Sequence, residues 1–137
     1  MPKVLYIEDN FDNRLLVRRI LMASDHGFDI VDVDNAKDGI EIARANPPDI
    51  ILMDVSMPEM DGLSATRQLR EIEELKTVPI VAITANAMEG DRERTLNAGC
   101  DGYIRKPIDV DKLPDQILAY IRSRNERSAR READSAD

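Results

Sequence analysis

Residues 50–54 read IILMD, four apolar side chains followed by one carboxylate, Asp54. An uninterrupted apolar run of this length is typical of a strand buried on both faces of a sheet. The same arrangement, a short apolar run that ends in polar residues, occurs elsewhere in the chain. The other runs are residues 4–7 before Glu8 and Asp9, residues 80–83 before Thr84, and residues 103–104 before Arg105 and Lys106.

Apolar residues at helical spacing separate these runs, and residues 28–33 alternate apolar and acidic side chains as an edge strand does. Strands that alternate with helices predict an α/β fold with a doubly wound parallel sheet, flavodoxin-like (βα)5 with strand order 2-1-3-4-5. The helical segments are expected at residues 11–24, with Phe11, Leu15, Leu16, Ile20 and Leu21 on the apolar face, and at residues 35–45, 63–72, 88–98 and 110–121.

The bulk composition excludes several classes of protein. A length of 137 residues suits one domain, and a net charge of −8 disfavours nucleic acid as a partner. No apolar run approaches the roughly 20 residues of a membrane-spanning helix. Cys100 is the only cysteine, so an internal disulfide is excluded and the reducing cytoplasm is the expected location. Apolar residues larger than alanine disappear after residue 122, and residues 123–137 are expected to form a charged tail, either a frayed helix or disordered.

The acidic residues Glu8, Asp9 and Asp54 follow two strands that flank the switch in strand order, where doubly wound sheets bind ligands. Carboxylates held close together repel one another unless a cation is present, and oxygen ligands in an open site suit Mg²⁺. We expect Asp9 and Asp54 as direct ligands and Glu8 as a ligand through water. The alternative, that each acidic residue only caps a helix or a turn, does not explain why both loops face one pocket.

A carboxylate held against Mg²⁺ can attack a phosphoryl group and form an aspartyl phosphate. Asp54 is the expected nucleophile. Lys106 would hold one phosphoryl oxygen, and the Thr84 hydroxyl with the Ala85 backbone N–H would hold another. Taken alone, Lys106 also fits an exposed loop lysine, and Thr84 also fits a strand-end residue that bonds its own turn.

Together these motifs resemble the receiver domain of two-component response regulators. The matching stretches are Glu8-Asp9-Asn10, residues 53–62 (MDVSMPEMDG), Thr84-Ala85 and residues 103–107 (YIRKP). They occur in the family's order and with its spacing over about residues 3–122. The resemblance implies a receiver domain at residues 1–122 that is a signalling protein and no independent enzyme.

The resemblance also implies a role for each site residue. Asp54 would accept the phosphoryl group from a phosphohistidine on a histidine kinase or a phosphotransfer protein. Glu8 and Asp9 would hold Mg²⁺, with the Ser56 backbone carbonyl completing the metal site. Lys106 matches the family's lysine, and Thr84 and Tyr103 match its hydroxyl and aromatic switch residues. Phosphorylation would draw Thr84 inward, which frees space beside Ala85 for Tyr103.

The signal would leave through protein contacts, because no room for a DNA-binding domain follows residue 122. The expected target surface comprises residues 88–98, 103 and 110–121, and the donor would dock on the first helix and the loop at Pro107. The donor surface would include Phe11, Arg14, Leu15 and Arg18, with the basic residues exposed.

Three other functions remain open at this point. One is a Mg²⁺-dependent phosphohydrolase, which would need an acid where Ser56 stands. The others are a flavin or nucleotide carrier, disfavoured by the acidic loop after the first strand, and an interaction module without phosphorylation.

Overall fold

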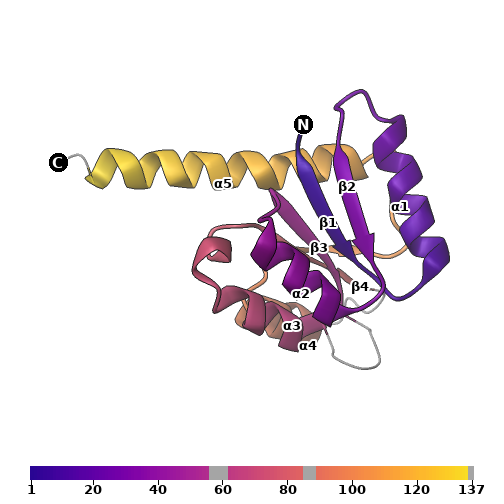
Figure 1. The fold of residues 1–137 in the computed structure, drawn as a ribbon, viewed down its shortest axis with the longest axis horizontal. Helices are drawn as coiled ribbons and strands as arrows, with labels where there is room; N and C mark the ends of the chain where they lie inside the picture. Colours follow the sequence, from indigo (N-terminus) through magenta and orange to yellow (C-terminus); the bar gives the residue numbers. More distant parts are fainter. Residues whose placement is uncertain (56–61, 85–88, 136–137) are drawn as a thin grey trace.

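The computed structural model describes residues 1–55, 62–84 and 89–135, with side chains left out at residues 62, 89–92 and 126–135. Within these residues, parallel strands form one sheet in the order β2-β1-β3-β4-β5 (Figure 1). The predicted fold class and strand order are therefore confirmed. The strands are β1 Lys3–Ile7, β2 Asp29–Val33, β3 Ile50–Asp54, β4 Ile80–Thr84 and β5 Gly102–Arg105.

Helices connect the strands and cover both faces of the sheet, as parallel crossovers require. Helices α1 and α5 pack on one face, and α2 and α3 pack on the other. The described helices are α1 Phe11–Ala23, α2 Ala36–Ala45, α3 Gly62–Arg70, a short 3₁₀ turn at Glu73–Leu75, α4 Glu89–Asn97 and α5 Leu113–Ser135.

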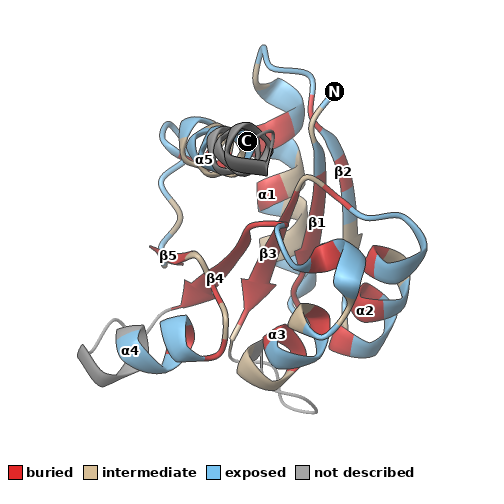
Figure 2. Ribbon diagram, turned by 90° about the vertical axis from the view of Figure 1, so that its left-hand side faces the viewer, coloured by how far each residue is buried: buried red, intermediate tan, exposed pale blue. Residues whose placement is uncertain are grey.

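Burial follows the position of each strand in the sheet. All residues of β3 and β4 are buried, whereas the edge strand β2 exposes Asp29 and Val31 (Figure 2). Both central strands run one residue beyond the predicted ends, because Asp54 pairs with Ile83 and Thr84 pairs with Arg105 in the ladders. Asp54 and Thr84 are therefore the last residues of their strands, held by the sheet itself.

Helix α2 lies close enough to β1 that a side chain larger than hydrogen does not fit between them. A Cβ atom at Gly39 would lie 2.4 Å from Cδ1 of Ile7, which is fully buried. Asn35 caps this helix by accepting a hydrogen bond from the Asp38 backbone N–H at 2.8 Å. The close approach fixes the end of β1, from which the acidic loop of the site begins.

The apolar face predicted for α1 is partly wrong. Ile20 and Leu21 are buried together with Val17, but Phe11 is 65% exposed and Leu16 is 42% exposed. Residues 17, 20 and 21 share one helical face, and the sheet covers that face only. Helix α1 therefore carries exposed apolar side chains on its solvent side, including Met22 at 68% exposure.

Helix α5 extends past the body of the domain (Figure 1). The charged segment after residue 122 continues this helix to Ser135. Arg124 Nη1 lies 3.9 Å from Asp49 Oδ1 just before β3, which joins the start of this segment to the domain. Among the described residues, no helix combines the length and the apolar character needed to cross a membrane.

Candidate functional site

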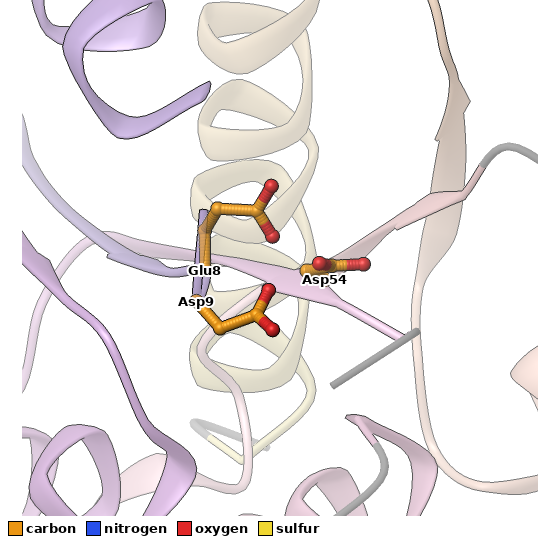
Figure 3. A group of neighbouring side chains, drawn as sticks. All are labelled: Glu8, Asp9 and Asp54. Atoms are coloured by element: carbon orange, nitrogen blue, oxygen red, sulfur yellow. The ribbon is translucent and has the colours of Figure 1, made fainter. Parts of the chain in front are cut away.

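Three carboxylates meet at the carboxyl edge of the sheet. Glu8 and Asp9 follow β1, and Asp54 ends the neighbouring strand β3. Their side chains point toward a shared space (Figure 3), and one oxygen from each lies within 4.8 Å of the others. The prediction that these three carboxylates lie together is therefore confirmed.

The three carboxylates differ in their access to solvent. Glu8 and Asp54 are buried, at 0% and 2% exposure, whereas Asp9 is exposed. The shared space is therefore closed on the side of Glu8 and opens to solvent at Asp9. A partly open set of carboxylate oxygens is the donor chemistry that Mg²⁺ binds while it keeps some of its water.

The backbone of Glu8 is held at both of its polar groups. The Glu8 N–H donates to the Val33 carbonyl at 3.0 Å, and the Glu8 carbonyl accepts from Arg14 Nη1 at 2.8 Å. The Glu8 side chain has two unequal oxygens. Oε1 accepts from Asn13 Nδ2 and from Lys106 Nζ, the latter at 3.3 Å, whereas Oε2 is buried and has no hydrogen-bond partner among the described residues.

Lys106, which directly follows the edge strand β5, brings a positive charge to the carboxylates. Its Nζ lies 3.3 Å from Glu8 Oε1 and 3.8 Å from Asp54 Oδ2. The Lys106 backbone N–H donates to the Thr84 carbonyl at 2.8 Å, and the Lys106–Pro107 peptide bond is cis. The lysine is thus placed between two carboxylates and is no exposed loop residue, since its side chain is only 23% exposed.

The electrostatics of the site leave one carboxyl only partly ionised at neutral pH. Burial, followed by the neighbouring Asp54 carboxyl, raises the pKa of Glu8 to about 7. The Asn13 carboxamide and the Lys106 ammonium oppose this rise. One lysine therefore does not neutralise the acidic cluster, and a bound cation would complete the charge balance.

Thr84 and Tyr103 emerge on the same face of the sheet. Tyr103 pairs with Ala82 in the ladder between β5 and β4, and both pack in the cluster beneath α2 and α3. Alternate residues of a strand share a face, so Thr84 lies on the same side as Ala82. Thr84 is buried and Tyr103 is half-buried, so the aromatic ring is partly accessible.

Two of the predicted site residues lie outside the described residues. These are Ser56, whose carbonyl was expected to complete the metal site, and Ala85, whose N–H was expected to hold a phosphoryl oxygen. The predicted target surface also begins within this undescribed part of the chain, at residue 88.

Two residues of α1 support the site and were not recognised from the sequence. Asn13 holds the Glu8 side chain, and Arg14 holds the Glu8 backbone and pairs with Asp32, its Nε 3.4 Å from Oδ2. The expectation that Arg14 is an exposed docking residue is therefore wrong, because its side chain is only 15% exposed. The only sequence signal was the position of Asn13 in the first turn of a predicted helix, three residues after its cap.

Comparisons with known proteins agree with this geometry. The response regulator receiver domain family matches residues 4–118. Relatives named "Polar-differentiation response regulator DivK" include one from Brucella anthropi, 41% identical over 122 residues, covering 88% of this chain and 98% of the relative. Another, from Brucella ovis, is 40% identical over 118 residues, covering 86% of this chain and 94% of the relative.

Solved structures show the same likeness. The receiver domain of the sensor histidine kinase PA1611 from Pseudomonas aeruginosa, solved with a magnesium ion in its active-site cleft, is 36% identical with a TM-score of 0.80. That match covers 88% of this chain and 97% of the other. The chemotaxis protein CheY4 of Vibrio cholerae shares the fold, with a TM-score of 0.82 at 24% identity over 88% of this chain and 98% of that one.

Proposed function

The chain belongs to the response regulator receiver domain family, and on that premise we propose that Asp54 is the residue that accepts the phosphoryl group. The protein is a phosphorylation-switched signalling receiver and no conventional enzyme. A single geometric relationship carries the assignment of Asp54. Its buried carboxylate lies within 4.8 Å of oxygens of Glu8 and Asp9 and has the Lys106 ammonium 3.8 Å away.

Mg²⁺ fits the oxygens of this pocket. Glu8, Asp9 and Asp54 supply carboxylates, and the buried Oε2 of Glu8 has no hydrogen-bond partner among the described residues. The Ser56 carbonyl would complete the set. When bound, the ion supplies positive charge that offsets both the clustered carboxylates and the transferring phosphoryl group.

The transfer reaction needs one nucleophile and several groups that neutralise charge. An Asp54 oxygen attacks the phosphorus of a phosphohistidine on a histidine kinase or phosphotransfer protein. The P–N bond breaks, its electron pair goes to the imidazole, and that ring takes up a proton. Lys106 binds one phosphoryl oxygen, and Thr84 with the Ala85 N–H binds another.

The switch follows from the shared face of Thr84 and Tyr103. When the Thr84 hydroxyl moves toward the phosphoryl group, it leaves space on the face where Tyr103 packs. Tyr103 fills that space, and the surface at residues 88–98, 103 and 110–121 changes shape. A local charge thereby biases a two-state element that a downstream protein reads.

The donor protein docks on α1 in this proposal. The solvent side of α1 exposes Phe11 at 65% and Met22 at 68%, with half-buried Leu15 between them. An exposed apolar strip of this kind suits a protein partner. We also place the protein in the cytoplasm, since its free and buried Cys100 suits a reducing compartment.

Phosphorylation by a small donor tests the assignment of Asp54. With Mg²⁺ and acetyl phosphate, the wild type should gain one acid-stable, base-labile phosphoryl group, measured by intact mass. Asp54→Asn should remove this labelling while the circular dichroism spectrum is kept. The matched control is the exposed Asp12→Asn, which should label like the wild type; full labelling of Asp54→Asn would reassign the acceptor.

A further inference from the structure

We propose that Asn13 is a positioning residue for the metal-dependent reaction. Its carboxamide holds Oε1 of Glu8 and thereby orients the carboxylate, one oxygen of which lies within 4.8 Å of oxygens of Asp9 and Asp54. This inference rests on the proposed function of the pocket. It assigns to α1 a role inside the site, on the side of the helix that faces the acidic loop.

The cap of α1 holds the backbone of Asn13 in place, independently of the contact between its side chain and Glu8. Asn10 caps α1 and accepts a hydrogen bond from the Asn13 backbone N–H at 3.0 Å. The Asn13 carboxamide then donates to Glu8 Oε1 across the turn between β1 and α1. Because the cap fixes the backbone, the amide loses little freedom when it makes this bond.

The two oxygens of Glu8 consequently have different surroundings. Oε1 has the donors of Asn13 and Lys106, whereas Oε2 is buried and has no hydrogen-bond partner among the described residues. A buried acceptor without a partner destabilises the folded state. A cation, or a water molecule bound to it, would give this oxygen a partner.

Lys106 cannot replace Asn13 in this role throughout the reaction. The lysine lies between Glu8 and Asp54, at 3.3 and 3.8 Å. In the proposed transfer reaction it binds an oxygen of the phosphoryl group instead. Arg14 and Val33 hold only the backbone of Glu8. The orientation of the Glu8 carboxylate then depends on the carboxamide of Asn13.

The test is Mg²⁺ binding to the unphosphorylated protein, measured by titration calorimetry. Asn13→Leu keeps a similar volume and removes the donor, and we expect it to raise the dissociation constant for Mg²⁺ about tenfold, as the loss of a residue that orients a metal ligand does. The matched control is Asn35→Ala, which removes the cap of α2 and lowers stability at a position outside the acidic cluster. The control should bind Mg²⁺ like the wild type.

Two further measurements separate positioning from a structural role. In a Glu8→Gln background, Asn13→Leu should change Mg²⁺ affinity less than about twofold, because residues that act through one contact are not additive. With acetyl phosphate, Asn13→Leu should need more Mg²⁺ for half-maximal labelling and regain the wild-type rate at saturation. A residue that only stabilises the fold would lower the unfolding temperature without moving this midpoint.

The possible outcomes are distinct. An unchanged Mg²⁺ dissociation constant in folded Asn13→Leu overturns the inference, as does an equal loss in the Glu8→Gln background. If the leucine variant does not fold, Asn13→Ser, which is too short to reach Oε1, takes its place under the same criteria. If the wild type itself neither binds Mg²⁺ nor labels at Asp54, the proposed function falls and this inference falls with it.

Discussion

The Lys106 ammonium lies 3.3 Å from Glu8 Oε1, although 98 residues separate the two in the chain. The same ammonium lies 3.8 Å from Asp54 Oδ2. Strand β5, which precedes Lys106, stands two strands away from β3, which ends in Asp54. The lysine therefore contacts both carboxylates from the position directly after β5, the strand that carries Tyr103.

Lys106→Ala should separate metal binding from signalling. The oxygens of Glu8, Asp9 and Asp54 stay in place, so Mg²⁺ affinity should change less than about threefold, and removal of a nearby cation should if anything strengthen it. The conformational response should be lost, measured as hydrogen exchange of residues 102–121 with and without acetyl phosphate. Lys112→Ala, an exposed lysine, is the control. A wild-type exchange response in Lys106→Ala would remove the lysine from the switch.

The stability of the metal-free protein should fall as pH rises from about 4.5 to about 7. In this window folded Glu8, with its pKa raised to about 7, binds a proton that the unfolded chain has released. The proton therefore stabilises the folded state at the acid end, and up to about 3 kcal/mol is lost by pH 7. Urea unfolding with chelator at pH 5 and pH 7.5 measures the difference between wild type and Glu8→Gln.

Saturating Mg²⁺ should remove this fall in stability between pH 5 and pH 7, because the cation favours the ionised form of Glu8 and so lowers its pKa. A pH dependence that is identical in wild type and Glu8→Gln would assign it to other groups.

Thr84→Ala should leave the acceptor intact and weaken the switch. Asp54 keeps its place at the end of β3, so labelling by acetyl phosphate should reach the wild-type extent. The phosphoryl group would lose a hydroxyl partner, and Tyr103 would lose the trigger for its movement. Hydrogen exchange at residues 102–105 should then change less on phosphorylation. Thr66→Ala, which removes another buried hydroxyl, near Cys100, is the control, and an equal exchange response in both variants would contradict the role of Thr84.

Arg70→Ala should destabilise the domain through contacts that lie outside the phosphorylation site. The guanidinium joins the end of α3 to the loops that flank β4 and β5, and its side chain is 19% exposed. We expect a loss of about 3 kcal/mol in urea unfolding, because the partly buried Asp101 carboxylate and several carbonyls lose this partner. Its partners are the carbonyls of Gly99 at 2.8 Å, Leu75 at 3.0 Å, Lys76 at 3.3 Å and Val78 at 2.7 Å, and Asp101 Oδ2 at 2.6 Å.

Arg67→Ala is the control for Arg70, because Arg67 lies on the same helix and is exposed. It should change stability by less than about 0.5 kcal/mol. Equal effects of the two substitutions would show that the contacts of Arg70 contribute no more than those of a surface residue.

Removal of the chain after Arg122 should leave a folded receiver. The contact between Arg124 and Asp49, at 3.9 Å, is an ion pair near the surface and is worth at most about 1 kcal/mol. Urea unfolding and acetyl phosphate labelling should both stay close to the full-length values. A loss of more than about 2 kcal/mol would instead make the helical segment after residue 122 part of the domain.

Much of the site was predictable because parallel strands end at a common edge. Glu8, Asp9, Asp54 and Lys106 each come at the end of an apolar run, and the strand order predicts that these residues lie at one edge of the sheet. The start of α2 was equally local, since the helix expected from residue 35 has Asn35 as its cap. The contacts of Asn13 and Arg14 were not predictable, because both depend on the angle at which α1 leaves the acidic loop.

The amino-acid sequence by itself determined the order of strands and helices, the edge of the sheet at which the acidic residues lie, and the family of the protein. Periodicity and strand-end chemistry are local, so each can be read along the chain. Only the tertiary structure decided which face of α1 is buried and which carboxylate is shielded, because burial depends on packing between distant elements. For this reason Glu8 is enclosed while its neighbour Asp9 is open to solvent, and Arg14 is held against Asp32 while Phe11 is exposed.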